Sequence, residues 1–274
     1  MTTGESDYET FYPTSVMETG YDILRWWVAR MVMMGYFATG KPQFKNIVLH
    51  GLVNDPLGKK MSKSKGNVVN PLELVEQYGA DAVRFALVYG TALGNDQVLS
   101  YPKLESARRF TNKLWNIGRF IEMKRNGLSN SHPELVSGSH GIPDQARLAG
   151  GSSKRVRNDN LEELKSFAKS ETDKEWVGKV SSLVSEVSKN METYQFNQVS
   201  EKLYEFVWHQ FADIYIENVK QRIDSNSFTI LYSLFSILLK LLHPMMPFVT
   251  DEIYRKLSGS EKSLMISPWP NLEK

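Results

Sequence analysis

Three stripes of apolar residues between residues 180 and 241 commit the C-terminal part of the chain to packed helices. Within each stripe the apolar positions recur three or four residues apart, a spacing that places them on one face of an α-helix. Residues 103–124 show the same spacing, and Pro247 is suited to begin a last helix that ends near Leu257. We therefore expect an all-α bundle. The stripes are Val180/Leu183/Val184/Val187, Phe196/Val199/Leu203/Phe206/Val207 and Ile230/Leu231/Leu234/Ile237/Leu238/Leu241.

Residues 1–100 have a different hydropathy pattern, in which short apolar runs alternate with a helical periodicity. An extended run at 14–17, a turn at 18–22, a helix from Ile23 to about Phe37 and a second run at 47–49 predict a β-α-β unit. Such a unit favours two parallel strands joined by a right-handed crossover. Ligands of parallel sheets sit at the carboxyl ends of the strands, which here are residues 18–22 and 50–53.

The sequence also predicts structural roles for single residues in and near this unit. The Asp22 carboxylate is placed to cap the following helix. Trp27, on an apolar helix face, is by periodicity alone a core residue. Downstream, Asn70, Pro71 and Glu73 form a helix start, with Asn70 as the cap and Glu73 at the third helical position. A second short helix is predicted over residues 81–88.

Composition excludes several classes of protein. The chain has 274 residues and no cysteine, so disulfides, thiolate catalysis and cysteine zinc sites are excluded. Its five histidines show no metal-ligand spacing, and we predict no metal site. The apolar stretch at 228–249 is interrupted by Lys240, His243 and two prolines, which favours a buried helix over a membrane span. The default expectation is a soluble cytoplasmic protein without a membrane partner.

The formal net charge of +2 does not by itself indicate a nucleic-acid partner, but the charge is unevenly distributed. The helix predicted at 103–124 is strongly basic. One reading is a solvated face, and the other is a surface that contacts phosphates. The second reading would use Arg108, Arg109, Lys113 and Arg119. Residues 127–159 are rich in Gly, Ser and Asn, cannot supply a packed core, and are expected to form a flexible insertion.

A lysine–serine loop at 59–67 is the most specific local signal. Lys60, Lys63 and Lys65 can place ammonium groups around a phosphate chain, while Ser62 and Ser64 add hydroxyl donors. The spacing of a Gly-rich phosphate cradle is not met, because the glycines at 51 and 58 enclose six residues and Lys60 stands where a Ser or Thr is required. The loop composition therefore indicates a polyanion ligand through its lysines.

The residues Lys60-Met61-Ser62-Lys63-Ser64 carry a family resemblance. They are the Lys-Met-Ser-Lys-Ser signature of the class I aminoacyl-tRNA synthetases. Residues 11–16 and 19–31 resemble the valyl-tRNA synthetases in particular, mainly through Trp27-Val28-Ala29-Arg30-Met31. His50-Gly51-Leu52-Val53 and the segments at 78–85, 112–116 and 211–217 also resemble that family. The resemblance covers roughly 11–125 and 173–270.

The resemblance implies a function and a set of site residues. The family activates valine with ATP, accompanied by Mg²⁺, and transfers the valyl group to valine tRNA. Lys63, assisted by Lys60, would neutralise charge on the leaving pyrophosphate, and Trp27 would wall the valine pocket. Such a pocket rejects larger side chains by volume but does not easily reject threonine. The remaining ATP-binding residues implied by the family are Gly20, Asp22, His50, Gly51, Met61, Ser62 and Ser64.

The family also has features that this sequence lacks. Its N-terminal catalytic half carries a His-x-Gly-His element, which occurs nowhere here. We therefore expect an α/β plus all-α chain: the second half of a Rossmann-type parallel sheet at 1–100, then a helical anticodon-binding domain at 101–274. Three hypotheses remain open. The chain is an inactive C-terminal portion of a valine–tRNA ligase, one half of a split enzyme that needs a separate N-terminal half, or a non-catalytic tRNA-binding module.

Overall fold

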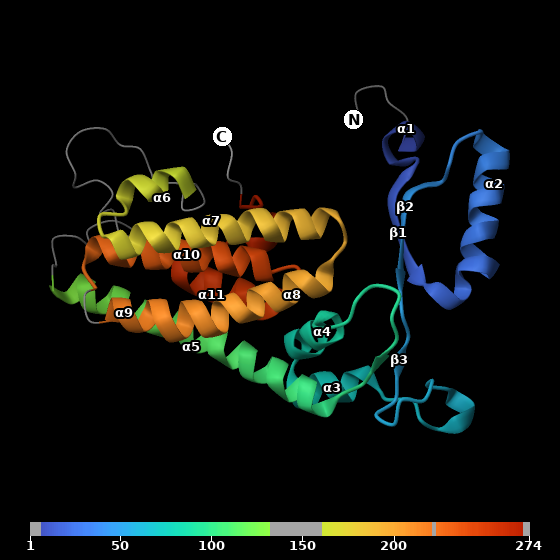
Figure 1. Cartoon of the computed structure of the whole chain (residues 1–274), viewed down its shortest axis with the longest axis horizontal. Helices are drawn as coiled ribbons and strands as arrows, with labels where there is room; N and C mark the ends of the chain where they lie inside the picture. The colour runs from blue at the N-terminus through green and yellow to red at the C-terminus, as the bar shows by residue number, and fades with distance from the viewer. Residues whose placement is uncertain (1–6, 132–160, 221–222, 271–274) are drawn as a thin grey trace. The chain divides into compact units, whose positions relative to one another are not determined.

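The computed structural model describes residues 7–131, 161–220 and 223–270 (Figure 1). The chain divides into two compact units, and both are discontinuous in sequence. The first comprises Met1–Val69 and Thr91–Ser100, and the second comprises Asn70–Gly90 and Tyr101–Lys274. The helices that follow the lysine–serine loop thus pack with the helical part of the chain rather than with the strands.

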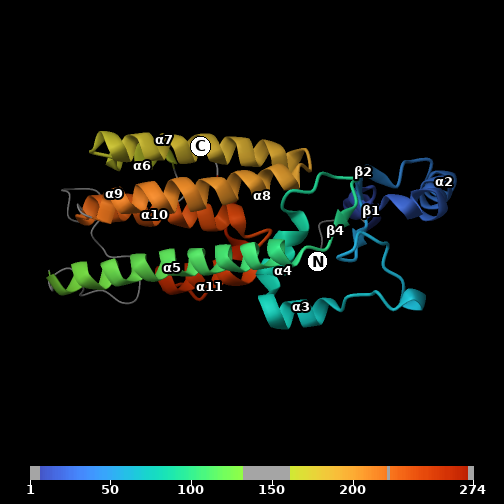
Figure 2. The same ribbon diagram turned by 60° about the horizontal axis from the view of Figure 1, so that its bottom comes forward.

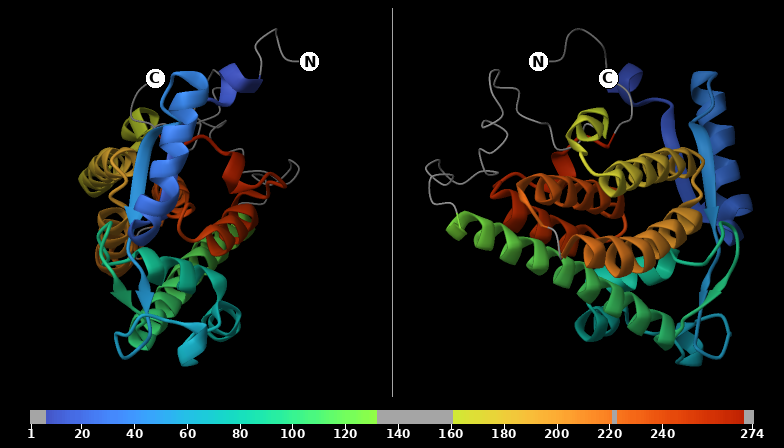
Figure 3. Two further views of the ribbon diagram at one scale, coloured as in Figure 1. Left: turned by 90° about the vertical axis from the view of Figure 1, so that its right-hand side faces the viewer. Right: turned by 60° about the vertical axis from the view of Figure 1, so that its left-hand side comes forward.

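Two pairs of parallel strands form the framework of the first unit. Strand β1 (Thr14–Gly20) pairs with β2 (Phe44–His50), and β3 (Val53–Asn54) pairs with β4 (Gln97–Val98). Between β1 and β2 the chain forms α2 (Ala29–Thr39), which runs back alongside the two strands (Figure 3). The other elements are α1 (Asp7–Phe11), the 3₁₀ turns η1 (Tyr21–Ile23) and η3 (Lys63–Lys65), and the π-helical η2 (Leu24–Val28).

The predicted β-α-β unit is confirmed, with two corrections at the end of β1. The turn predicted at 18–22 is wrong for its first three residues, because pairing with β2 continues the strand as far as Gly20. The capping role of Asp22 is also wrong. Gly20 occupies the cap position of η1 without a side-chain bond, and Asp22 lies inside the first turn, where its carboxylate is free to face Lys60.

The second unit is a bundle of helices arranged in layers. Figure 2 shows α7 and α6 above α8, α9 and α10, with α5 and α11 below. The apolar stripes predicted from sequence supply its core, and all six stripe residues of α10 have no exposed surface. The elements are α3 (Pro71–Tyr78), α4 (Ala80–Val88), α5 (Tyr101–Ser131), α6 (Leu161–Phe167), α7 (Glu171–Glu192), α8 (Phe196–Glu205), the π-helical η6 (Phe206–Tyr215), α9 (Ile216–Lys220), α10 (Ser225–Leu242), α11 (Pro247–Ser258) and the 3₁₀ turn η7 (Leu264–Ile266).

Helix α10 is apolar enough and long enough to cross a membrane by composition alone, but 83% of it is buried inside the bundle. This confirms the buried helix expected from the interrupted apolar stretch. Helix α5 corrects another expectation, since it continues through Ser131, so residues 127–131 of the expected insertion are helical. The rest of that segment, 132–159, lies outside the described residues.

Side chains fix two helix starts in this unit. Asn70 accepts the N–H of Leu72 at 3.0 Å and donates to Glu73 at 3.1 Å, which confirms the predicted cap of α3. The buried Asp81 of α4 accepts the N–H groups of Phe248 and Val249, at 3.1 and 2.6 Å, in the first turn of α11. Burial raises the pKa of Asp81, although these two bonds oppose that shift.

Candidate functional site

The carboxyl ends of β1 and β2 lie side by side, since Gly20 and His50 are partners in the parallel register. The His50 ring is exposed. Its Nε2 lies 3.2 Å from the Glu18 carboxylate and its Nδ1 lies 2.7 Å from the Gly51 carbonyl. Of the residues implied for the ATP site, Gly20, His50 and Gly51 are thus adjacent at one sheet edge.

Both glycines at this edge occupy places that a side chain would disturb. A Cβ on Gly20 would lie 2.9 Å from the Asp22 carboxylate, and a Cβ on Gly51 would lie 1.9 Å from the Asn95 carbonyl oxygen. The second contact is with backbone, which cannot move aside as a flexible side chain can. Gly51 therefore allows the segment after β2 to lie against the chain before β4.

The lysine–serine loop meets the strand end through one ion pair. Lys60 Nζ lies 3.4 Å from Asp22 Oδ2, and both groups are partly exposed. Within the loop, the hydroxyl oxygens of Ser62 and Ser64 are 2.8 Å apart. Lys63 is exposed in η3, and Met61 and Ser62 are half-buried. The residues implied for the nucleotide site come from three segments of one unit: Gly20 and Asp22, His50 and Gly51, and residues 60–64 of the loop.

Two further carboxylates, which the sequence did not single out, organise this region. Asp55 is buried and accepts bonds from both ends of the lysine–serine loop. Asp96 accepts the N–H of Leu52 at 2.7 Å and the hydroxyl of Tyr21 at 3.2 Å. The bond to Asp96 raises the pKa of the Tyr21 phenol. Nothing local in the sequence indicates that the Asp55 carboxylate is buried.

Trp27 lies in η2 and is 60% exposed, so its reading as a core residue is wrong. The π-helical segment and α2 turn many of their large apolar side chains to solvent. In this part of the unit the exposed ones are Trp26, Trp27, Met33, Met34, Tyr36 and Phe37. A face of this kind marks an interaction surface or a ligand-binding groove. Trp27 belongs to this face, and Phe37 is its most exposed member.

The four basic residues predicted to contact phosphates all lie on α5, but they differ in environment. Arg108 and Arg109 share the Glu105 carboxylate at 3.8 and 3.5 Å. Lys113 is 2.8 Å from Asp213, and its ammonium lies 5.5 Å from the centre of the Trp208 ring. Three of the four positive charges are therefore already paired with carboxylates.

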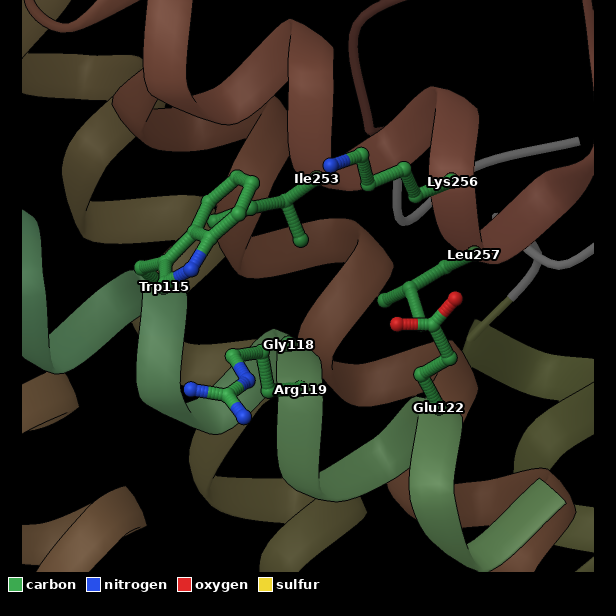
Figure 4. Close-up of a pocket in the computed structure, with 7 residues that line it drawn as sticks. All are labelled: Trp115, Gly118, Arg119, Glu122, Ile253, Lys256 and Leu257. Carbon is green, nitrogen blue, oxygen red and sulfur yellow. The ribbon is translucent and has the colours of Figure 1, made fainter. Parts of the chain in front are cut away.

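The fourth residue, Arg119, lines a pocket between α5 and α11 (Figure 4). The pocket has a volume of about 240 Å³, and the Lys256 ammonium lies 4.5 Å from the centre of the Trp115 ring at its wall. Gly118 lies between these side chains, where an added Cβ would come within 2.8 Å of Ile253 Cγ2. Helices α5 and α11 thus approach closely at Gly118. Charged, aromatic and aliphatic side chains of both helices line the pocket around that point.

Within residues 7–131, 161–220 and 223–270, no group of three His, Asp or Glu side chains is arranged to hold a metal ion. The site consists of loop lysines, glycine-lined strand ends and the Asp22–Lys60 and Glu18–His50 contacts. This combination is suited to hold a phosphate chain by charge and by close backbone approach.

Comparison with known proteins finds two family models that match separate parts of the chain. The sequence profile of "tRNA synthetases class I (I, L, M and V)" matches residues 2–100, and that of "Anticodon-binding domain of tRNA ligase" matches residues 173–274. A valine–tRNA ligase of Clostridium acetobutylicum is 39% identical over 97% of this chain, and one of Thermus thermophilus is 40% identical over 96%. The chain spans 28% and 27% of the lengths of these two relatives.

Solved structures show the same fold at low sequence identity. A leucyl-tRNA synthetase of Agrobacterium radiobacter K84, in a ternary complex with tRNA, superposes with a TM-score of 0.68 over 95% of this chain and 29% of its own, at 20% identity. A methionyl-tRNA synthetase of Mycobacterium tuberculosis in complex with methionyl-adenylate has a TM-score of 0.63 over 91% of this chain and 45% of its own, at 19% identity. The partial Rossmann-type sheet and the helical anticodon-binding fold are confirmed. Over nearly its whole length the chain is similar to valine–tRNA ligases, and its two matched segments are similar to the class I tRNA synthetases and to the anticodon-binding domain of tRNA ligases.

Proposed function

We propose that this chain supplies the lysine–serine loop and the anticodon-binding helices of a valine–tRNA ligase. In the first step, a carboxylate oxygen of valine attacks the α-phosphate of ATP, a new O–P bond forms, and the bond to pyrophosphate breaks. In the second, a ribose hydroxyl at the end of valine tRNA attacks the carbonyl carbon, and AMP leaves. Catalysis of this kind depends on positioning and on stabilising charge.

The observation that carries the proposal is the contact between Lys60 and Asp22. It joins the loop to the glycine-lined ends of β1 and β2, so one unit contains both a group for the ribose and groups for the phosphates. Asp22 would accept the ribose hydroxyls, His50 and Gly51 would line the adenine, and Lys63 would face the leaving pyrophosphate. Mg²⁺ fits this arrangement as a companion of the ATP phosphates, since such ions keep several waters and few protein ligands.

The exposed apolar face favours a second candidate, in which the chain acts as one half of a split synthetase. Trp26, Met33 and Phe37 are 59%, 69% and 86% exposed, and β1 has only β2 as a strand partner among the described residues. A polypeptide that carries the His-x-Gly-His half of the family could cover this face and add strands to β1. Trp27 would then wall the valine pocket from this side.

Valine-dependent ATP–pyrophosphate exchange separates these possibilities. We expect no exchange from the purified chain alone, because Trp27 and the strand edge face solvent and leave the valine site open. Addition of a polypeptide with the other half of the family's catalytic domain should produce exchange. Exchange by the chain alone, retained when host synthetases are removed, would contradict this account. Failure of every such polypeptide to restore activity would favour a tRNA-binding module.

A further inference from the structure

The lysine–serine loop is closed at its base by Asp55. Oδ1 of this buried carboxylate accepts the N–H groups of Leu57 at 3.0 Å and of Lys59 at 2.8 Å. The backbone adds a bond from the Asp55 N–H to the Lys59 carbonyl at 2.8 Å. One oxygen of Asp55 therefore shapes the turn that leads into the lysines.

Asn67, twelve residues later, closes the loop from the other side. Its Nδ2 donates to Asp55 Oδ2 at 2.8 Å and to the Lys60 carbonyl at 3.3 Å, and its Oδ1 accepts the Ser62 N–H at 2.9 Å. A single side-chain amide thus holds the buried carboxylate and the backbone on both sides of Met61. We refer to the bonded pair of Asp55 and Asn67 as the clasp.

Apolar packing contributes little to the order of this loop. Residues 56–66, all of which the structure describes, include no buried residue, and four lysines within them are exposed. Since the lysines repel one another, the loop needs specific bonds to keep one conformation. The bond from Asn67, followed by the N–H of Lys59, lowers the pKa of Asp55. The carboxylate is therefore charged at neutral pH and holds the amide with a charge-assisted bond.

We propose that Asp55 and Asn67 are positioning residues, whose clasp fixes the backbone at Lys60 and Ser62 and so holds the loop lysines around a bound polyphosphate. The inference rests on the proposed function, because it takes the phosphate chain of ATP as the ligand. Neither clasp residue would touch that ligand. Both act through the backbone of residues that do.

Exchanging the two side chains gives a direct test in the full chain. Asp55→Asn places two amides face to face, and Asn67→Asp places two carboxylates face to face. The double variant, Asp55→Asn with Asn67→Asp, restores a donor and an acceptor between the two side chains and has the charge of the unmodified chain, but it leaves the Lys60 carbonyl without the amide donor of residue 67. In each single variant, we expect amide hydrogen exchange at Leu57, Lys59 and Ser62 to accelerate about tenfold, as for loss of one buried bond to a charged group. The double variant should recover part of the original protection, because the bond between the two side chains returns and the bond to the Lys60 carbonyl does not.

Pyrophosphate binding, measured by titration calorimetry at several salt concentrations, tests the positioning role itself. Asp55→Asn makes the chain more positive by one charge, so electrostatics alone would strengthen binding, whereas loss of the clasp should weaken it about tenfold. The double variant should regain affinity. Lys63→Ala serves as the comparison, since it removes a phosphate contact and should also reduce the dependence on salt.

The outcomes separate the clasp from the function on which it rests. Unchanged amide hydrogen exchange rates in the single variants would overturn the positioning role of the clasp and leave the proposed function intact. Equal pyrophosphate affinity in the unmodified chain, the two single variants and the double variant would do the same. Tighter binding by Asp55→Asn would also overturn it. Absence of pyrophosphate binding by the unmodified chain would instead contradict the proposed nucleotide site.

Discussion

Lys63 and Lys65 lie in the same exposed turn, η3, yet only Lys63 belongs to the five-residue family signature. In a reconstituted enzyme, we expect Lys63→Ala to slow adenylate formation roughly a hundredfold, about 3 kcal/mol, while valine affinity changes little. The reason is that its charge matters most when negative charge develops on the pyrophosphate. Lys65→Ala removes the same charge from the same turn but lies outside the signature, and we expect it to slow adenylate formation less than Lys63→Ala does. Equal losses of valine affinity and rate would show that Lys63 only orders the loop.

A second prediction at the residue scale concerns pH. His243 is half-buried, its Nδ1 lies 2.8 Å from the Thr250 hydroxyl, and burial lowers its pKa below the usual 6.5. As pH falls through 6.5 and then the folded-state pKa, the unfolded chain takes up the proton first, so native stability is lost. The raised pKa of Asp81 has the opposite effect, because it stabilises the folded chain as the pH falls. The contribution of His243 is therefore obtained by comparing a His243 variant with the unmodified chain. We expect His243→Gln to reduce the loss of unfolding free energy, measured by urea denaturation, between pH 7.5 and 5.5; an unchanged loss would contradict the role of His243.

At the scale of elements, the contact of α5 with α11 depends on a glycine. A Cβ at Gly118 would lie 2.8 Å from Ile253 Cγ2, whereas one at Gly178, in α7, would meet nothing within 4 Å. We expect Gly118→Ala to lower the free energy of unfolding by about 1–3 kcal/mol through overpacking. Gly178→Ala should be neutral or stabilising by up to about 1 kcal/mol through helix propensity. Urea unfolding of both variants measures the two free energies of unfolding. Equal changes in the two variants would mean that α5 and α11 can move apart at Gly118 without loss of stability.

Several elements could be predicted from sequence because their signals are local. The stripe of α10, the cap at Asn70 and the alternation of strand and helix at 14–49 each depend on neighbouring residues. The bonds of Asp55 to Asn67 and of Asp96 to Leu52 join residues 12 and 44 positions apart, and no periodicity encodes them. Trp27 failed as a core residue because helical spacing identifies an apolar face without identifying what covers it.

At the scale of the whole molecule, charge distribution sets the expected interaction with RNA. We expect valine tRNA to bind weakly through Arg108, Arg109, Lys113 and Arg119, with affinity that falls steeply with salt as counterions are released. Because three of these charges are shared with Glu105 and Asp213, the salt dependence should be smaller than four free charges would give.

Binding of valine tRNA and of an anticodon-swapped tRNA at several salt concentrations checks this expectation. Discrimination should come from the anticodon, whose exposed bases can stack on the bundle or bond to it. Similar affinities for both RNAs would leave only a nonspecific basic surface. Undetectable or salt-insensitive binding would contradict the proposed RNA contact.

The discontinuity of the first unit has a consequence for synthesis on the ribosome. The clasp and the strands β1 and β2 are translated early, but Asn95, against which Gly51 lies, and Asp96, which holds Leu52, come only after α3 and α4. The nascent chain therefore carries an incomplete first unit while two helices of the second unit emerge, and those helices pack against α5, which follows them in the sequence. Completion of the first unit is thus tied to the start of the second, and translation that stalls before residue 100 should yield a chain in which neither unit is closed.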